Sequence, residues 1–178
     1  MMDSFTPDLT ENANIVVNAE GILSFGGRTY RAAIGKAGMR CDKCEGDGAS
    51  PVGIWQLRYV MYRADRVAPP RTGLPVYALT PDDGWCDDPH NRAYNRPVRL
   101  PFADRYENLW REDHVYDLIV TLGHNDDPAL PGNGSAIFMH IARPDYDGTE
   151  GCIALAQDDL EAILADSGVY TRLCIDRK

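Results

Sequence analysis

The arrangement in this sequence that can do covalent chemistry is a Gly-Cys pair with a histidine twelve residues before the cysteine. The cysteine is Cys152, preceded by Thr149, Glu150 and Gly151, and the histidine is His140. Glycine takes a positive φ at little cost and lets a substrate carbonyl approach the backbone, so amides around Gly151 can point at a developing oxyanion. With His140 as the base, this spacing predicts a cysteine/histidine acyl-transfer site.

The same two residues also fit a purely structural interpretation. Cysteine is among the residue types most often buried, and a cysteine and a histidine at this spacing are usually two unrelated residues. The flanking sequence favours a positioned pair, because residues 136–142 have the apolar pattern of a buried strand that delivers His140 near its end. Residues 143–148 have turn composition and lead back to the cysteine.

Two motifs, in the same order along the chain, resemble the YkuD family of L,D-transpeptidases. Residues 138–155 resemble the catalytic motif, in which a strand histidine and a loop precede Ser/Thr-x-Gly-Cys and an apolar residue. Residues 45–55 resemble the family's Thr-Pro-x-Gly-x-aromatic turn, with Ser50 in place of threonine. Two motifs in the right order are much more specific than one.

The chain departs from the family pattern at three positions near the cysteine. Ile141, Glu150 and Ala154 stand where members commonly carry glycine, histidine, and arginine or asparagine. The interval between histidine and cysteine is also shorter than usual. The resemblance therefore carries over the acyl-transfer core but not the substrate-binding details, and it implies a divergent branch of the family.

By this resemblance the protein is a peptidoglycan L,D-transpeptidase. The family chemistry implies that His140 takes the proton of Cys152, and that the thiolate attacks an amide carbonyl of a stem peptide to leave a thioacyl-enzyme. Backbone amides at residues 150–152 would stabilise the oxyanion. The side-chain amine of meso-diaminopimelate from a second stem then makes the cross-link, with the donor bond at the third stem residue or, in a divergent enzyme, the first. No metal or organic cofactor is implied.

Three other functions stay open. With water as the acceptor, the enzyme would be an L,D-carboxypeptidase or amidase. A catalytically silent wall-binding domain would keep the fold without the chemistry, although the presence of both His140 and Cys152 argues against it. A cytosolic cysteine hydrolase is the third, because residues 1–6 lack the basic and apolar regions of a signal peptide. The resemblance implies a periplasmic location, and a cytoplasmic one is the alternative.

Four residues are candidates for substrate binding. Thr149 and Glu150 lie within the catalytic motif, and Glu150 would bind the acceptor ammonium in place of the family's second histidine, or simply face solvent. His124 and Asn125 follow an apolar run in a polar loop. They either line the cleft or form a surface turn of the kind that asparagine and aspartate favour.

Composition limits the class of protein. The chain has 178 residues with 44% hydrophobic and 25% charged residues, which suits a single domain over residues 1–178 with a real core. Its net charge of -9, without a basic stripe, makes nucleic acid an unfavourable partner. No apolar run approaches the ~18 residues of a membrane span.

Five cysteines leave at least one thiol unpaired. Cys41 and Cys44 have a CxxC spacing, which suits a zinc half-site, a local disulfide or two reduced surface thiols. The zinc interpretation lacks a second ligand pair, since the four histidines show no paired spacing. Cys86 and Cys174 are most simply core or strand residues.

The fold that must position these residues is predicted to be mainly β, a YkuD-like mixed sheet or sandwich with one principal helix after the cysteine. Gly26 and Gly27 have the composition of a two-residue hairpin turn. Strands are expected at residues 14–17, 22–25, 28–31, 54–62, 116–122, 137–141 and 170–175.

The helix is expected to start at residue 157 and to stop at residues 167–168. Acidic residues occupy its first turn, and its apolar face consists of Leu160, Ile163 and Leu164. If its axis points at Cys152, its dipole would help to lower the thiol pKa.

Residues 64–115 are irregular and contain seven prolines. Long loops on a rigid scaffold are either disordered or functional. Because this segment also contains tryptophans and tyrosines, we expect an ordered excursion that forms a lid over the cleft.

Overall fold

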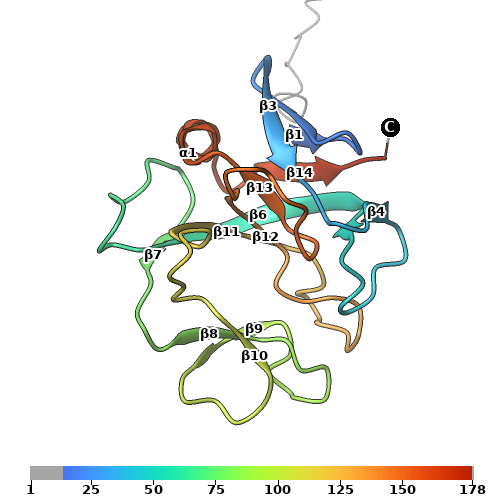
Figure 1. Ribbon diagram of the computed structural model, residues 1–178, viewed down its shortest axis with the longest axis vertical. Helices are drawn as coiled ribbons and strands as arrows, with labels where there is room; N and C mark the ends of the chain where they lie inside the picture. Colours follow the sequence, from blue (N-terminus) through green and yellow to red (C-terminus); the bar gives the residue numbers. More distant parts are fainter. Residues whose placement is uncertain (1–13, 178) are drawn as a thin grey trace, which may run out of the picture.

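The computed structural model describes residues 14–177, and they form the mainly-β fold with one helix that the sequence predicts (Figure 1). The helix is α1 (Gln157–Ala165). The strands in chain order are β1 (Asn14–Val17), β2 (Ile22–Phe25), β3 (Arg28–Ala33), β4 (Met39–Arg40), β5 (Ser50–Pro51), β6 (Gly53–Tyr62), β7 (Val76–Ala78), β8 (Asp83–Cys86), β9 (Arg96–Arg99), β10 (Tyr106–Asn108), β11 (Leu118–Leu122), β12 (Phe138–Ile141), β13 (Ile153–Leu155) and β14 (Arg172–Ile175).

One large mixed sheet forms the body of the molecule. Its order is β11-β12-β13-β3-β2-β1-β14-β6-β7, and a further pairing of β11 with β6 closes it on itself. Strand β6 is long enough to pair with β14 through its first half and with β11 through its second. The pairs β12–β13, β1–β14 and β6–β7 are parallel, and the others in this sheet are antiparallel.

The predicted hairpin turn is confirmed. Gly26 and Gly27 have φ values of 56° and 74°, in the left-handed region that a tight two-residue turn requires. Phe25 of β2 pairs with Arg28 of β3 directly across them. The turn therefore fixes the register of β2 against β3, and the far end of β3 pairs with β13 next to the site.

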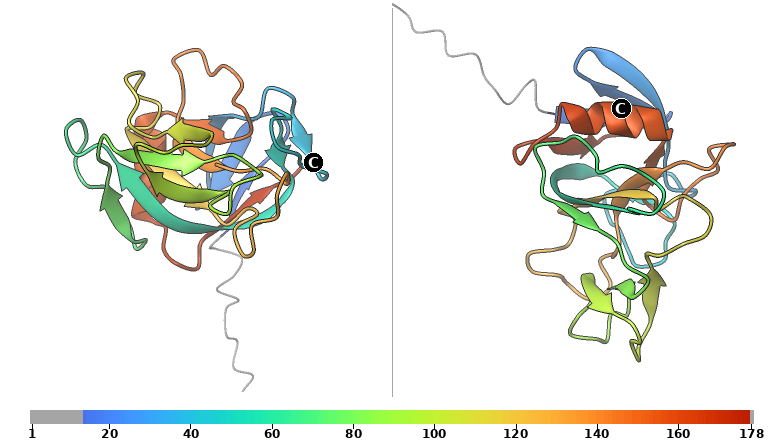
Figure 2. Two further views of the ribbon diagram at one scale, coloured as in Figure 1. Left: turned by 90° about the horizontal axis from the view of Figure 1, so that it is seen from below. Right: turned by 90° about the vertical axis from the view of Figure 1, so that its left-hand side faces the viewer.

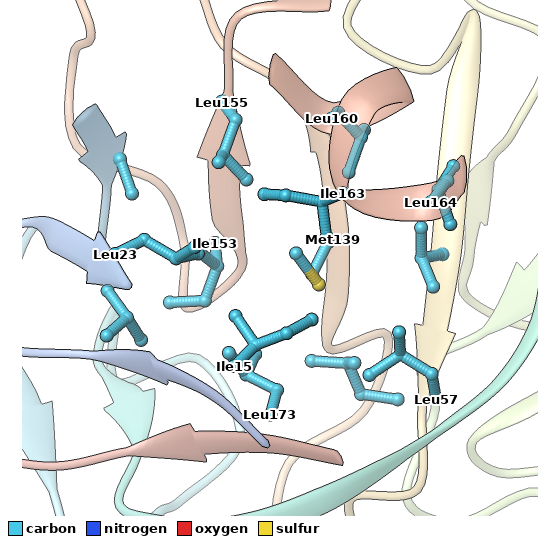
Figure 3. Close-up of a cluster of buried hydrophobic side chains, with 14 of the residues drawn as sticks. Ile15, Leu23, Leu57, Met139, Ile153, Leu155, Leu160, Ile163, Leu164 and Leu173 are labelled. Carbon is cyan, nitrogen blue, oxygen red and sulfur yellow. The ribbon is translucent and has the colours of Figure 1, made fainter. Parts of the chain in front are cut away.

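Helix α1 covers the core as its sequence pattern predicts. Leu160, Ile163 and Leu164 are fully buried and pack with side chains of the sheet, Met139 and Leu155 among them (Figure 3). The hydroxyl of Ser167 donates to the Ile163 carbonyl at 2.7 Å, just beyond the end of the helix.

The segment 64–115 is more regular than the sequence suggests. Besides β7, it contains a three-stranded antiparallel sheet in the order β10-β8-β9, called here the accessory sheet. This sheet lies at the opposite end of the molecule from α1 (Figures 1 and 2). A second hydrophobic cluster joins it to the large sheet, and this cluster includes Trp85, Leu109, Tyr116, Phe138 and Cys152.

Other differences from the expected elements are small. The short strands β4, β5 and β13 were missed, and two strands begin two residues later than expected, at Leu118 and Arg172. Cys86 is buried in β8 and Cys174 lies in β14, as predicted.

Candidate active site

Alternation of side chains along β12 and β13 separates the core from the site. Met139 and Ile153 pair in register and belong to the main core. Phe138 and Cys152 precede them and belong to the second cluster on the other face. His140 lies two positions beyond Phe138, so His140 and Cys152 project from the same face of adjacent parallel strands.

That face forms the floor of a pocket of about 680 Å³. The pocket contains both His140 and Cys152 and is bounded by the accessory sheet and by loops from distant parts of the chain. Its charged lining residues are Lys43, Glu45, Asp87, Arg105, Glu107, Arg111, Arg143, Asp147 and Glu150.

The turn before Cys152 requires the glycine that the sequence places there. Gly151 has φ +138°, and a Cβ at this position would lie 2.8 Å from the Ala49 carbonyl oxygen. Thr149 organises the turn: its hydroxyl donates to the Cys152 carbonyl at 2.6 Å and accepts from the Gly151 amide at 3.1 Å. The Gly151 amide is therefore occupied, which departs from the expectation that it faces an oxyanion.

His140 is held as a neutral imidazole. Burial lowers its pKa to about 4, an effect to which Arg111 and Arg143 add, while the hydrogen bond to the Ile141 carbonyl opposes it. Nδ1 lies 2.9 Å from that carbonyl oxygen, which can only accept, so Nδ1 carries the proton. Nε2 is then the basic nitrogen. The ring also meets Tyr116 edge-on, with centroids 5.3 Å apart.

Cys152 is a buried thiol rather than an activated thiolate. Its Sγ donates to the Ala136 carbonyl and accepts from the Phe138 amide, both at 3.3 Å. Burial, followed by the charge of Glu107, raises its pKa to about 12. Desolvation outweighs the favourable contributions at this position, so the thiol pKa is raised overall. The expected contribution of the α1 dipole stays a prediction.

Glu107 is a site residue that sequence reasoning missed. It lies in β10, lines the pocket and accepts a hydrogen bond from the buried hydroxyl of Tyr116. Burial raises its pKa, while Tyr116 and Arg111 act in the opposite direction. No local pattern marks this glutamate, since only the fold brings β10 over Cys152.

Lys43 is a second residue that sequence reasoning missed as part of the site. Its side chain is 5% exposed and forms an ion pair with Asp47. Nζ lies 3.4 Å from where a Cβ on Gly151 would be, so the ammonium sits against the turn that carries Cys152. The CxxC spacing drew attention to the flanking cysteines instead.

Thr149 and Glu150 both line the pocket, and their predicted contact with substrate stays a prediction. Thr149 acts within the turn, as described above. Glu150 has a side chain that is 74% exposed and pairs with Lys36. It faces the solvent side of the pocket, so its predicted contact with an acceptor amine stays a prediction.

Within residues 14–177, His124 and Asn125 are not among the residues that line this pocket. The Nε2 atom of His124 lies 3.0 Å from the Asn133 carbonyl, and its ring meets Trp55 edge-on. Asn125 has φ 48° and bonds three backbone groups, two on Leu130 and one on Gly134. Both side chains hold the loop before β12, which corresponds to the structural interpretation of this segment.

Residues 45–55, the second motif that resembles the family, support the site from behind. Ser50 is fully buried, and its hydroxyl accepts the Gly35 amide at 2.9 Å. Trp55 donates from its indole to the Pro51 carbonyl at 3.0 Å. A Cβ on Gly35 would lie 2.5 Å from the Ser50 amide nitrogen, so the two backbones are in direct contact.

Cys41 and Cys44 are exposed free thiols in the structure. In the part of the chain that is described, no group of three or more histidine, cysteine or acidic side chains is arranged to hold a metal ion. Nor does any helix there have the length and apolar character needed to cross a membrane.

Fold and site together define a β-domain whose buried cysteine and histidine share a charged pocket. The comparison with known families agrees with this description. The family model of the YkuD L,D-transpeptidase catalytic domain matches residues 14–173, and the chain belongs to this family. No match was found among curated proteins.

Proposed function

We propose that the protein is a peptidoglycan L,D-transpeptidase that acts through a thioacyl-enzyme on Cys152. The observation that carries the proposal is the projection of Cys152 and His140 into one pocket from adjacent parallel strands. Since stem peptides belong to the cell wall, the proposal places the enzyme in the periplasm.

Acylation begins with both groups neutral. The thiol turns from the Ala136 carbonyl toward His140, and Nε2 takes its proton as the sulfur attacks the donor amide carbon. The carbonyl π electrons move to oxygen and form a tetrahedral oxyanion, for which the Glu150 and Cys152 amides are the backbone donors proposed here. When the C–N bond breaks, the imidazolium returns its proton to the leaving amine.

Deacylation forms the cross-link. His140, neutral again, takes a proton from the acceptor amine of meso-diaminopimelate as the nitrogen attacks the thioester carbon. The tetrahedral intermediate collapses, the C–S bond breaks, and the sulfur recovers a proton from the imidazolium. The donor bond is at the third stem residue or at the first.

The charges around the pocket support a stem peptide as the substrate. Four cationic and five acidic side chains line it. Diaminopimelate carries both ammonium and carboxylate groups, so a lining of both signs can bind it, whereas an apolar pocket would leave these charges unpaired.

The test is mass spectrometry of stem peptides incubated with the purified protein and with Cys152→Ala as the matched control. We expect a cross-linked dimer with the parent and an acyl adduct on Cys152 after acid quenching. Cys152→Ala should form neither, while its circular dichroism spectrum stays unchanged.

Other outcomes would select the alternatives. Shortened peptides without dimers would identify an L,D-carboxypeptidase or amidase. Binding of peptidoglycan with neither adduct nor product would identify a catalytically silent domain and overturn the proposal.

A further inference from the structure

Lys43 is a buried cation at the centre of the site. Its side chain is only 5% exposed, and a lysine this buried is rare unless it is paired or functional. The stem lies against Gly134, where a Cβ would meet Cε at 3.0 Å, and the ammonium lies beside Gly151. The side chain therefore reaches from the loop before β12 to the turn before β13.

The pairing with Asp47 leaves some of the N–H donors of Lys43 without an acceptor in the part of the chain that the structure describes. Asp47 also accepts from the amides of Cys44 and Ala49, both at 2.9 Å, so this carboxylate mainly braces its own loop. An ammonium has three N–H donors, and among the described residues Lys43 donates only to Asp47. Two donors remain for a ligand in the pocket.

The turn beside this ammonium offers one backbone donor fewer than the three expected from residues 150–152. The Gly151 amide is bonded to the Thr149 hydroxyl and cannot bind an oxyanion at the same time. A cation in a water-poor site stabilises developing negative charge far more than it would in water. The position of Lys43 thus matches the missing donor in both place and charge.

We propose that Lys43 is a catalytic residue: its ammonium stabilises negative charge on the Cys152 sulfur during attack and then on the carbonyl oxygen of the tetrahedral intermediate. The second half of this role rests on the proposed acyl-transfer function. The first half concerns the thiol alone and holds for any reaction of Cys152.

The other charges that face Cys152 come from separate elements. Glu107 of β10 opposes the thiolate, and Lys43 favours it. His140 of β12 is neutral near pH 7, because its pKa is about 4. Behind Lys43, Asp47 offsets part of its field. Lys43 is therefore the cation that balances Glu107 at the sulfur.

The experiment measures two rates at pH 8 in the full chain. The first is alkylation of Cys152 by iodoacetamide, followed by peptide mapping so that the other cysteines do not interfere. The second is acylation of Cys152 by a carbapenem, a strained amide that yields an oxyanion on attack.

Four variants separate charge from packing. Lys43→Met removes the cation but leaves Asp47 unpaired, which can unfold the loop. The double variant Lys43→Met/Asp47→Asn removes both charges and keeps the test valid in that case. Lys43→Arg keeps the charge. Lys36→Met removes an exposed lysine on the same side of the molecule and is the matched control.

We expect the double variant to slow alkylation about tenfold, which corresponds to one pKa unit, and to slow acylation by about 10²-fold or more. Lys43→Arg should stay within about threefold of the parent for both rates, and Lys36→Met should match the parent.

Parental rates in the double variant would overturn the proposal. So would equal losses in Lys43→Arg and the double variant, since these would indicate packing alone. An acylation loss no larger than the alkylation loss would overturn the oxyanion role. Failure of the parent to process stem peptides would count against the proposed function only, because both rates can still be compared.

Discussion

The floor and the wall of the pocket are built in opposite ways. The floor consists of two adjacent strands, β12 and β13, whose reactive groups are buried among apolar side chains and bonded to backbone. The wall is formed by the Lys43 loop, the accessory sheet and surface arginines, and it is densely charged. In the proposed reaction the floor supplies the nucleophile and the base, and the charges of the wall surround them.

The difference shows that position and reactivity are specified separately in this domain. A thiol with pKa about 12 and an imidazole with pKa about 4 are not an ion pair in the resting protein. In the proposed reaction proton transfer therefore accompanies attack, and the charges on the wall modify the pKa that burial has already raised. Predictions that separate the floor from the wall follow, from the largest effect to the smallest.

Replacing His140 by asparagine should remove the proton acceptor from the floor of the pocket. Asn keeps a polar group of similar size but removes Nε2, so acylation by a donor peptide or a carbapenem should fall by about 10²- to 10⁴-fold. Stopped-flow acylation rates measure this, with the melting temperature as the control for folding. A loss below tenfold would mean that another group accepts the thiol proton.

Burial of the neutral imidazole should also make the fold acid-sensitive. Between pH 6.5 and 4 the unfolded His140 binds a proton that the folded one refuses, so the free energy of unfolding falls as pH falls through this window. The loss reaches about 3 kcal/mol at most. Urea titrations at pH 4.5, 5.5, 6.5 and 7.5 measure it.

The control is the His140→Asn variant, in which the free energy of unfolding should depend much less on pH between 6.5 and 4. The remainder belongs in part to His124, whose pKa is also lowered by burial. If parent and variant have the same slope, His140 is not the residue responsible.

The effect of a wall charge on the reactivity of Cys152 should increase with the burial of the side chain that carries it. Glu107→Gln keeps an acceptor for the Tyr116 hydroxyl but removes the negative charge that opposes the thiolate. Alkylation of Cys152 at pH 8 should rise by about three- to tenfold. Glu150→Gln, on a side chain that is 74% exposed, should change this rate less than about twofold because solvent screens it.

Glu150→Gln, compared with His140→Asn, also tests the binding of the acceptor amine. If Glu150 binds the incoming amine, Glu150→Gln should raise the share of hydrolysis over cross-linking while acylation stays nearly constant. An equal loss of acylation in Glu150→Gln and His140→Asn would place Glu150 in the catalytic unit and contradict this division of roles.

The floor could be predicted from the sequence because its signals are local. The apolar pattern of residues 136–142 predicts the strand that carries His140, and the Gly26-Gly27 turn and the apolar face of α1 can each be read within a few residues. Positive φ at Gly151 also follows from residue type in a tight turn.

The wall could not be predicted in this way, because it depends on long-range packing. Lys43 and Glu107 come to line the pocket of Cys152 only after distant segments have folded over β12 and β13. The raised pKa of Cys152 depends on burial, which spacing does not reveal. His124 and Asn125 have polar side chains suited to a cleft, but the structure uses their hydrogen bonds to shape a loop.

The backbone of Gly151 lies so close to the Ala49 carbonyl that a Cβ would not fit between them. Besides the Thr149 and Ser50 hydroxyls, close main-chain approaches support this region, at Gly151 against Ala49 and at Gly35 against Ser50. Main-chain supports do not change when neighbouring side chains are substituted. Side chains that line the pocket, such as Glu150 and Ala154, can therefore differ while these main-chain approaches around the sulfur stay in place.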